Sequence, residues 1–213
     1  EWCGTLFERL FEAFQSYWKQ RGLTLHEPEF PLVAIVFSNV KQFAAFAQRD
    51  AGPDAVTSKG YYSITTNRIV LYDLLAESRG NAILSAVEFR KRLTAEAFNV
   101  ATVVHEATHQ IAFNSGMHTR YADNPLWLTE GMAMFFETPD LKNDTGWTTV
   151  GAVNGPRLKQ FKTYLGTRRK SDSLATLLKT DGRFTNAKQA VDAYAETWSL
   201  NYFLIKEHEA DYV

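Results

Sequence analysis

The pattern of apolar and polar residues predicts strands in the first third of the chain and mainly helices after it. Apolar side chains recur at helical spacing over residues 6–18, and Gly22 follows as a typical C-cap. This aromatic stripe predicts a helix packed into the core. A further helix is expected over about 39–49. Short β-branched or aromatic runs predict three strands, at 32–37, 60–64 and 68–72, the last two joined as a hairpin through 65–67.

The strongest helical pattern runs from about Ala95 to Asn114, with Gly116 directly beyond it. Asn124 and Pro125 form an N-cap and first-turn pair for a helix that reaches about Glu137. Other helical segments are expected at about 81–93, 155–165, 173–178 and 186–207. Strands followed by helices indicate an α+β fold with one antiparallel or mixed sheet. We expect one domain over 1–213, with an N-terminal lobe at about 1–115 and a helical C-terminal lobe at about 116–213.

Composition narrows the functional classes. The 213 residues are 45% hydrophobic, which excludes a disordered chain, and 23 basic against 24 acidic residues argue against a nucleic-acid binder. No apolar run approaches the roughly 20 residues of a membrane span. Cys3 is the single cysteine, so an intrachain disulfide and a cysteine zinc site are excluded. The chain begins at Glu1, which is compatible with an extracytoplasmic protein whose signal peptide is removed, and the compartment stays open.

The candidate chemistry lies in the middle of the strongest predicted helix. Residues 105–109 read H-E-A-T-H, an H-E-x-x-H motif. On a helix, His105 and His109 lie about 40° apart and one turn along, so both can bind one metal ion. Glu106 lies about 100° round the helix, where it can deprotonate a metal-bound water as general base. The alternative is a helix with two surface histidines, but the apolar flanking residues predict a buried helix.

A catalytic zinc needs a third protein ligand and an open position. Glu130, in W-L-T-E-G-M-A, is the best candidate, because twenty intervening residues can turn the chain and lay a second helix alongside. Gly131 next to it would allow the backbones to approach closely. His118 lies beyond the Gly116 turn at no recognised ligand spacing, and a salt-bridged core role for Glu130 is the alternative.

The two motifs together resemble the gluzincin zinc metallopeptidases. The spacing of H-E-x-x-H and W-L-x-E-G-x-A is similar to that of the aminopeptidase and leukotriene-hydrolase family. This resemblance implies a zincin-like fold, one zinc per chain held by His105, His109 and Glu130, and Glu106 as general base. The family's G-x-M-E-N motif is missing, so aminopeptidase activity is not implied. The thermolysin-type aspartate four residues after the ligand is also missing, because Met134 stands there.

Two further expectations rest on this resemblance. Tyr194 occupies the place of the family's oxyanion-stabilising tyrosine, with Tyr202 and Tyr121 as fallbacks and a core tyrosine as the alternative. In zincins the strand nearest the active helix forms the edge of the substrate cleft, which suggests that role for the strand Arg68–Tyr72. An ordinary interior strand is the alternative.

Four segments, at 60–62, 67–73, 105–110 and 125–137, are similar to an uncharacterised bacterial family. Over nearly the whole chain the sequence resembles this family, domain of unknown function 1570, which is grouped with peptidase-MA-like gluzincins. The leading hypothesis is a zinc-dependent peptidase that acts on a peptide or protein through a metal-activated water. The alternatives are a zincin-fold binding or structural module that retains zinc without turnover, a metal-dependent hydrolase of another bond, and a helical protein with a chance motif.

Overall fold

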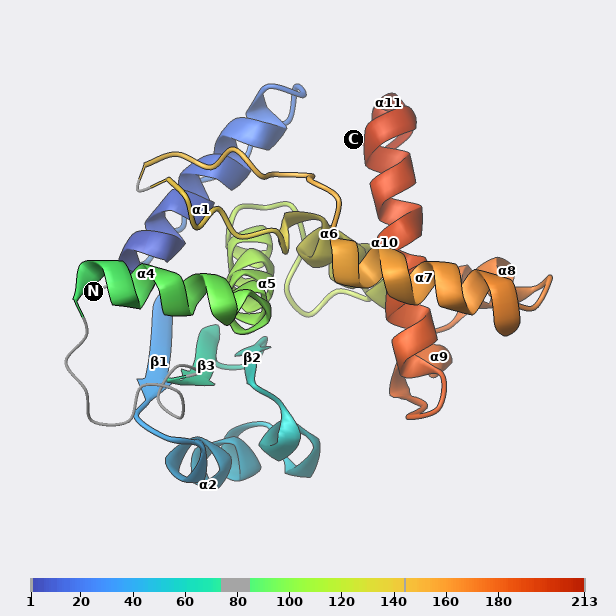
Figure 1. The fold of residues 1–213 in the computed structure, drawn as a ribbon. Helices are drawn as coiled ribbons and strands as arrows, with labels where there is room; N and C mark the ends of the chain where they lie inside the picture. The colour runs from blue at the N-terminus through green and yellow to red at the C-terminus, as the bar shows by residue number, and fades with distance from the viewer. Residues whose placement is uncertain (1, 74–84, 144, 213) are drawn as a thin grey trace.

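The computed structural model describes residues 2–73, 85–143 and 145–212, and within them the architecture is α+β with one small mixed sheet (Figure 1). The elements in chain order are α1 (Trp2–Lys19), β1 (Val33–Phe37), α2 (Val40–Asp50), the 3₁₀ helix η1 (Pro53–Thr57), β2 (Gly60–Ser63), β3 (Arg68–Tyr72), α4 (Ala86–Ala95), α5 (Ala97–Asn114), α6 (Leu126–Phe136), α7 (Gly155–Thr167), α8 (Ser173–Lys179), α9 (Gly182–Thr185), α10 (Ala190–Glu207) and α11 (Glu209–Tyr212). The expected helix at 81–93 is found as α4, and residues 81–84 of that expectation lie outside the described residues.

The sheet has the order β1-β3-β2, with β1 parallel and β2 antiparallel to β3. The hairpin prediction is confirmed. The suggestion that Arg68–Tyr72 forms the edge is wrong, because β3 is paired on both sides. Its run of buried apolar residues fits a central strand, which is covered on both faces. Within the hairpin, β2 is the edge strand.

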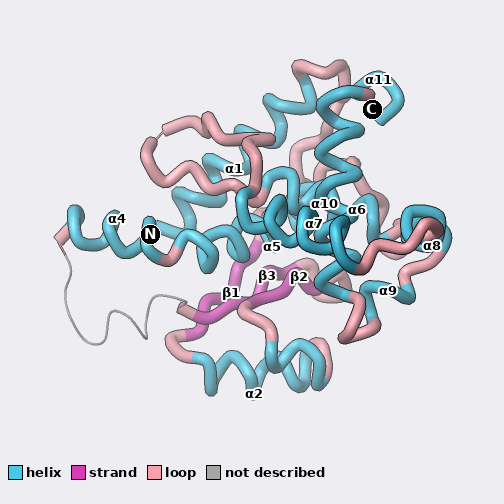
Figure 2. The backbone as a smooth tube through the Cα atoms, turned by 45° about the vertical axis from the view of Figure 1, so that its right-hand side comes forward, coloured by secondary structure: helices cyan, strands magenta, loops and turns pink. Residues whose placement is uncertain are grey.

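Side chains of β3 point alternately into two layers, which fixes what covers each face of the sheet. Val70 packs with Phe43 and Ala47 of α2 on one face. Ile69 and Leu71 face the main core, which α1 and α5 contribute to. In Figure 2 the sheet accordingly lies between α2 on one side and α5 on the other.

The main hydrophobic core surrounds α5 and includes residues from both halves of the chain. The aromatic stripe of α1 is buried there, as predicted, through residues such as Phe14 and Trp18. Phe135 and Phe136 of α6 and Ile205 of α10 belong to the same cluster. α6 is therefore held against α1 and α5 by apolar packing before any polar contact is counted. None of the described helices combines the length and the apolar character that crossing a bilayer requires.

The start of α6 differs from the prediction. The N-cap is Pro125 rather than Asn124, and the proline ring has no atom that can accept a hydrogen bond. The backbone N–H of Leu126 instead donates to Asp181 Oδ1, from the segment before α9, at 3.1 Å. This cap, from a residue 55 positions away, provides an acceptor for a free N–H of the first turn as a local cap would. The sequence around α6 does not predict it.

Gly131 allows a close approach, as predicted, but its partner is α10 rather than α5. A Cβ built on Gly131 would lie 1.8 Å from Nδ2 of Asn201. Asn201 is fully buried, and its Nδ2 donates to the carbonyl of Trp127 at 2.8 Å. Tyr212 donates to Oδ1 of the same amide at 2.7 Å. The amide thus joins α6, α10 and α11, and only glycine leaves room for it.

We predict that Gly131→Ala destabilises the fold by about 2–4 kcal/mol, because the amide must move and leave buried groups without hydrogen bonds. For a chain of this size, the expected decrease in Tm is roughly 5–10 °C. The matched control is Gly166→Ala in α7, where a Cβ would meet no neighbouring atom within 4 Å. That variant should unfold at or slightly above the wild-type temperature. Equal Tm values for the two variants would contradict the assignment.

Candidate metal centre

The two histidines of the motif lie one turn apart on α5 and face the same direction. His105 Nε2 and His109 Nε2 are 3.2 Å apart, and both side chains are about nine-tenths buried. Two ring nitrogens at this distance share one small space. Because α5 is buried along most of its length, neither ring is an ordinary surface histidine.

Glu130 of α6 meets both rings. Its Oε2 lies 3.1 Å from His105 Nε2, and its Oε1 lies 3.4 Å from His109 Nε2. One ligand atom from each of the three residues falls within 4.8 Å of the others. The structure therefore brings together the three residues that the sequence nominated, from two helices separated by a long loop.

The electrostatics of this cluster follow from burial and charge pairing. Burial alone would lower the pKa of His105, but pairing with Glu130, together with nearby Glu106 and Glu137, raises it to about 9. Burial would raise the pKa of Glu130, and the two histidines reverse this and hold it well below its usual range. Without a metal ion, the cluster is a buried ion pair.

Glu106 points to the sheet rather than joining the three ligand candidates. Its Oε2 accepts a hydrogen bond from the backbone N–H of Tyr62, in the edge strand β2, at 2.7 Å. Burial, against the opposing effect of both histidines, raises the pKa of this carboxyl above its usual value. The bond fixes the side chain through one oxygen and leaves the other available to a ligand.

Glu137, at the C-terminal end of α6, is a site residue that the sequence pattern did not single out. Its Oε2 lies 4.0 Å from His105 Nδ1, a buried nitrogen with no hydrogen bond to the described residues. Arg157 of α7 pairs with both carboxylate oxygens at 3.2 Å. Met134, at the position where a thermolysin-type aspartate would stand, is fully buried. Glu137 lies seven residues after Glu130, two helical turns along the same face, and that spacing is the signal that could have found it.

Tyr194 lies in the second turn of α10, near the cluster. Burial raises the pKa of its hydroxyl above the usual value, and the charges of Glu130, Glu106 and Glu137 add to the effect. The ring packs edge-on against Phe184, at 5.3 Å, and Arg157 lies over it at 5.8 Å.

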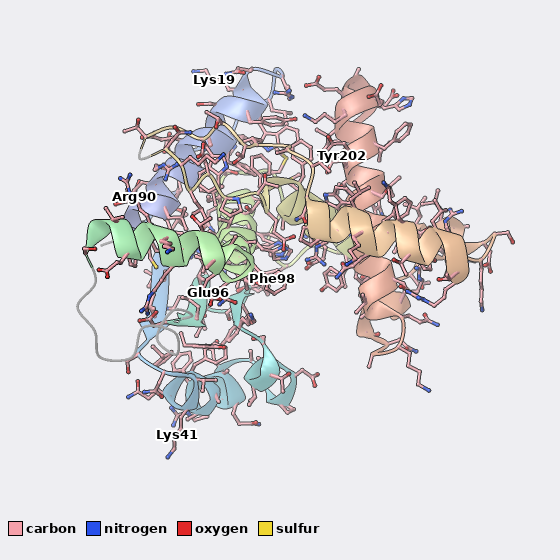
Figure 3. The ribbon with its side chains drawn as sticks, viewed as in Figure 1. Lys19, Lys41, Arg90, Glu96, Phe98 and Tyr202 are labelled. Carbon is pink, nitrogen blue, oxygen red and sulfur yellow. The ribbon has the colours of Figure 1, made fainter. Side chains whose placement is uncertain are left out.

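The two fallback tyrosines lie elsewhere. Tyr202, labelled in Figure 3, packs against Phe135 and Trp198 in the core region of α10. Tyr121 is 71% exposed, and its hydroxyl donates to the carbonyl of Thr65 at the tip of the hairpin. Neither side chain shows an interaction with the cluster, so Tyr194 remains the candidate of the three.

His118 is buried against Phe113 and stays outside the ligand cluster that the described residues form. Its Nε2 has no hydrogen bond to the described residues, and burial lowers the pKa of the ring to about 4. This side chain is a neutral core histidine in the structure.

A comparison with models of known protein families finds a match for this chain. The model of the family described as "Protein of unknown function (DUF1570)" matches residues 99–213, just over half of the chain. The chain belongs to this family. The matched segment carries α6 to α11 and nearly all of α5, so it contains all the residues of the cluster, while the sheet lies before it. Neither the curated proteins nor the solved structures contain a significant match.

The raised pKa of His105 makes a prediction for metal-free protein in EDTA. An unfolded histidine loses its proton near pH 6.5, whereas folded His105 keeps it to about pH 9. The stabilisation of the folded state by the charged His105 is therefore fully present below about pH 6.5, and it is lost as the pH rises through 9. The midpoint of urea unfolding should fall more steeply between pH 6.5 and 9.5 for the wild type than for His105→Gln. Parallel curves would contradict the pairing.

Proposed function

We propose that this chain is a zinc-dependent metallopeptidase of gluzincin type with a zincin-like fold. The observation that carries the proposal is the convergence of His105, His109 and Glu130, with Glu106 held beside them by the edge strand. In metal-assisted hydrolysis three of these groups would bind the metal ion, and the fourth would act as the base.

The donor set fits zinc. Two imidazole nitrogens and one carboxylate are a ligand combination of catalytic zinc sites, which keep a further position open. The two Nε2 atoms approach to 3.2 Å with Glu130 alongside, and a divalent cation among them would satisfy all three groups at once. When bound there, zinc supplies Lewis-acid activation of water and of a carbonyl group.

Glu106 has the position and the environment of a general base. The hydrogen bond from Tyr62 holds Oε2, so Oε1 is the atom that would take the proton. A pKa raised by burial makes a carboxylate a stronger base than it is in water. A purely structural metal site has no use for such a group, which favours an enzyme over a binding module.

The outer edge of β2 offers a place for an extended substrate. The N–H of Tyr62 points at Glu106 and therefore away from β3, and Gly60, two residues earlier, faces the same way. Among the described residues no further strand pairs with this edge. An extended peptide added here would run directly past Glu106, which supports a peptide as the substrate.

The metal assignment predicts the zinc content of three variants. His105→Ala and Glu130→Ala should bind far less than one zinc per chain, because each removes a ligand. Glu106→Gln should keep the zinc and lose roughly 10²–10⁴ in turnover of a mixed peptide library, because it removes a base and no ligand. Elemental analysis of purified protein and the library digest measure the two effects.

Stoichiometric zinc in both ligand variants would contradict the site. Loss of zinc in Glu106→Gln would make Glu106 a ligand. Zinc-loaded wild type that cleaves no library peptide would contradict the peptidase function and favour a binding module or a hydrolase of another bond.

Tyr194 is proposed to donate a hydrogen bond to the oxyanion that forms during hydrolysis. A donor aimed at developing charge contributes roughly 10²–10³ in rate. Tyr194→Phe should therefore lower turnover by that factor with the zinc content and Tm nearly unchanged. Tyr202→Phe is the matched control on the same helix. Equal turnover in wild type and Tyr194→Phe would leave Tyr194 as a packing residue.

A further inference from the structure

Two contacts set the register between β2 and the N-terminal half of α5. The first joins Tyr62 to Glu106, and the second joins the ammonium of Lys59 to Oδ1 of Asn99. Lys59 precedes Tyr62 by three residues, about 10 Å along an extended strand. Asn99 precedes Glu106 by seven residues, about 10.5 Å along a helix. The start of β2 and this part of α5 therefore run side by side in the same direction.

The ammonium of Lys59 pairs with an amide rather than with a carboxylate of the described residues. Within the described ranges no Asp or Glu oxygen lies within ion-pair distance of its ammonium. Its polar contact is the neutral Asn99 amide, and the ring of Phe98 lies 4.9 Å from Nζ. The same amide donates to Glu96 Oε2 at 2.8 Å, so Asn99 links the lysine to the carboxylate of Glu96. An ammonium has three donors, and one of them is used here.

Phe98 adds an exposed apolar surface beside this charge. The side chain is 59% exposed although it lies on the otherwise buried α5. Figure 3 shows Phe98 and Glu96 where α4 joins α5, close to the region of β2. A cation next to an exposed aromatic ring suits a ligand group that is anionic at one end and carries carbon atoms behind it.

We propose that Lys59, Phe98 and Asn99 form a subsite for a substrate carboxylate, about three residues from the bond that is cleaved. The proposal rests on the proposed peptidase function and on a substrate extended along β2. At about 3.3 Å per residue, a peptide that passes Glu106 reaches Lys59 after about three residues. The carboxylate is that of an acidic side chain or of the substrate's own C-terminus, and both offer the same oxygens to Lys59.

The experiment is a position-resolved digest by the zinc-loaded full chain. Peptides carry Glu, Gln or Lys at each position from four residues before to four residues after the cleaved bond. A second set ends three residues after that bond as either the free acid or the amide, which separates the two sources of the carboxylate. The variants are Lys59→Met, which keeps the aliphatic stem against Phe98, and Lys59→Glu. Lys41→Met on α2, across the sheet from α5, is the matched control (Figure 3).

The expected result is a preference for Glu over Gln, or for the free acid over the amide, two to four residues from the cleaved bond. Lys59→Met should reduce the ratio of kcat/KM values for the two members of the pair roughly tenfold, the scale of a hydrogen bond to a charged group. Lys59→Glu should reverse the preference toward Lys. A lysine that only tethers β2 to α5 would alter Tm and overall rate but not this ratio.

Two outcomes would overturn the proposal, and they differ from each other. Cleavage with no acidic preference in this window, or with a preference that Lys59→Glu leaves intact, removes the subsite while the peptidase function stands. Absence of cleavage by zinc-loaded wild type removes the peptidase function and the subsite together. Fluorescence anisotropy can also measure how tightly the same peptides bind to Glu106→Gln, with and without Lys59→Met. This comparison gives the contribution of Lys59 to binding in the absence of turnover.

Discussion

The buried carboxylate of Glu130 is the group on which the arrangement of the C-terminal half depends. A charge removed from water is costly unless a partner meets it, and here the partners are two imidazoles on another helix. α6 must therefore lie at one height and rotation against α5. Apolar packing of Phe135 and Phe136 supplies the free energy for this docking, and the polar contacts select the orientation. Removal of the carboxylate alone would leave the rest of α6 with its packing but without that constraint.

Contacts in the middle and at the C-terminal end of α6 support this orientation. Near Glu130, the absence of a side chain on Gly131 admits Asn201, which ties α10 to the backbone of α6. At the far end, Glu137 lies near His105 and is held by Arg157 of α7. Helices from the last third of the chain thus brace a cluster whose histidines lie on α5. Because ligand geometry must be held within a fraction of an ångström, such bracing is what a metal site requires.

Most elements and the core of the site could be predicted because they are local. A helix carries its own period, so His105 and His109 could be placed on one face from spacing alone. Gly131 next to Glu130 predicted that another helix approaches α6 closely, but the sequence did not show that this helix is α10. The central position of β3 and the cap from Asp181 could not be deduced, since both depend on which distant segments meet. Glu137 was missed because the expected partner stands one turn after the ligand, and the structure places it two turns after.

The three clustered side chains and the strand that holds Glu106 lie in different parts of the chain. The cluster lies wholly in the segment that the family model matches, on α5 and α6. The sheet contributes through β2, because the backbone N–H of Tyr62 binds Glu106. Lys59, directly before β2, binds Asn99 near the start of α5. A backbone donor is insensitive to the identity of its side chain, so the edge strand can keep its hold on Glu106 while its side chains change.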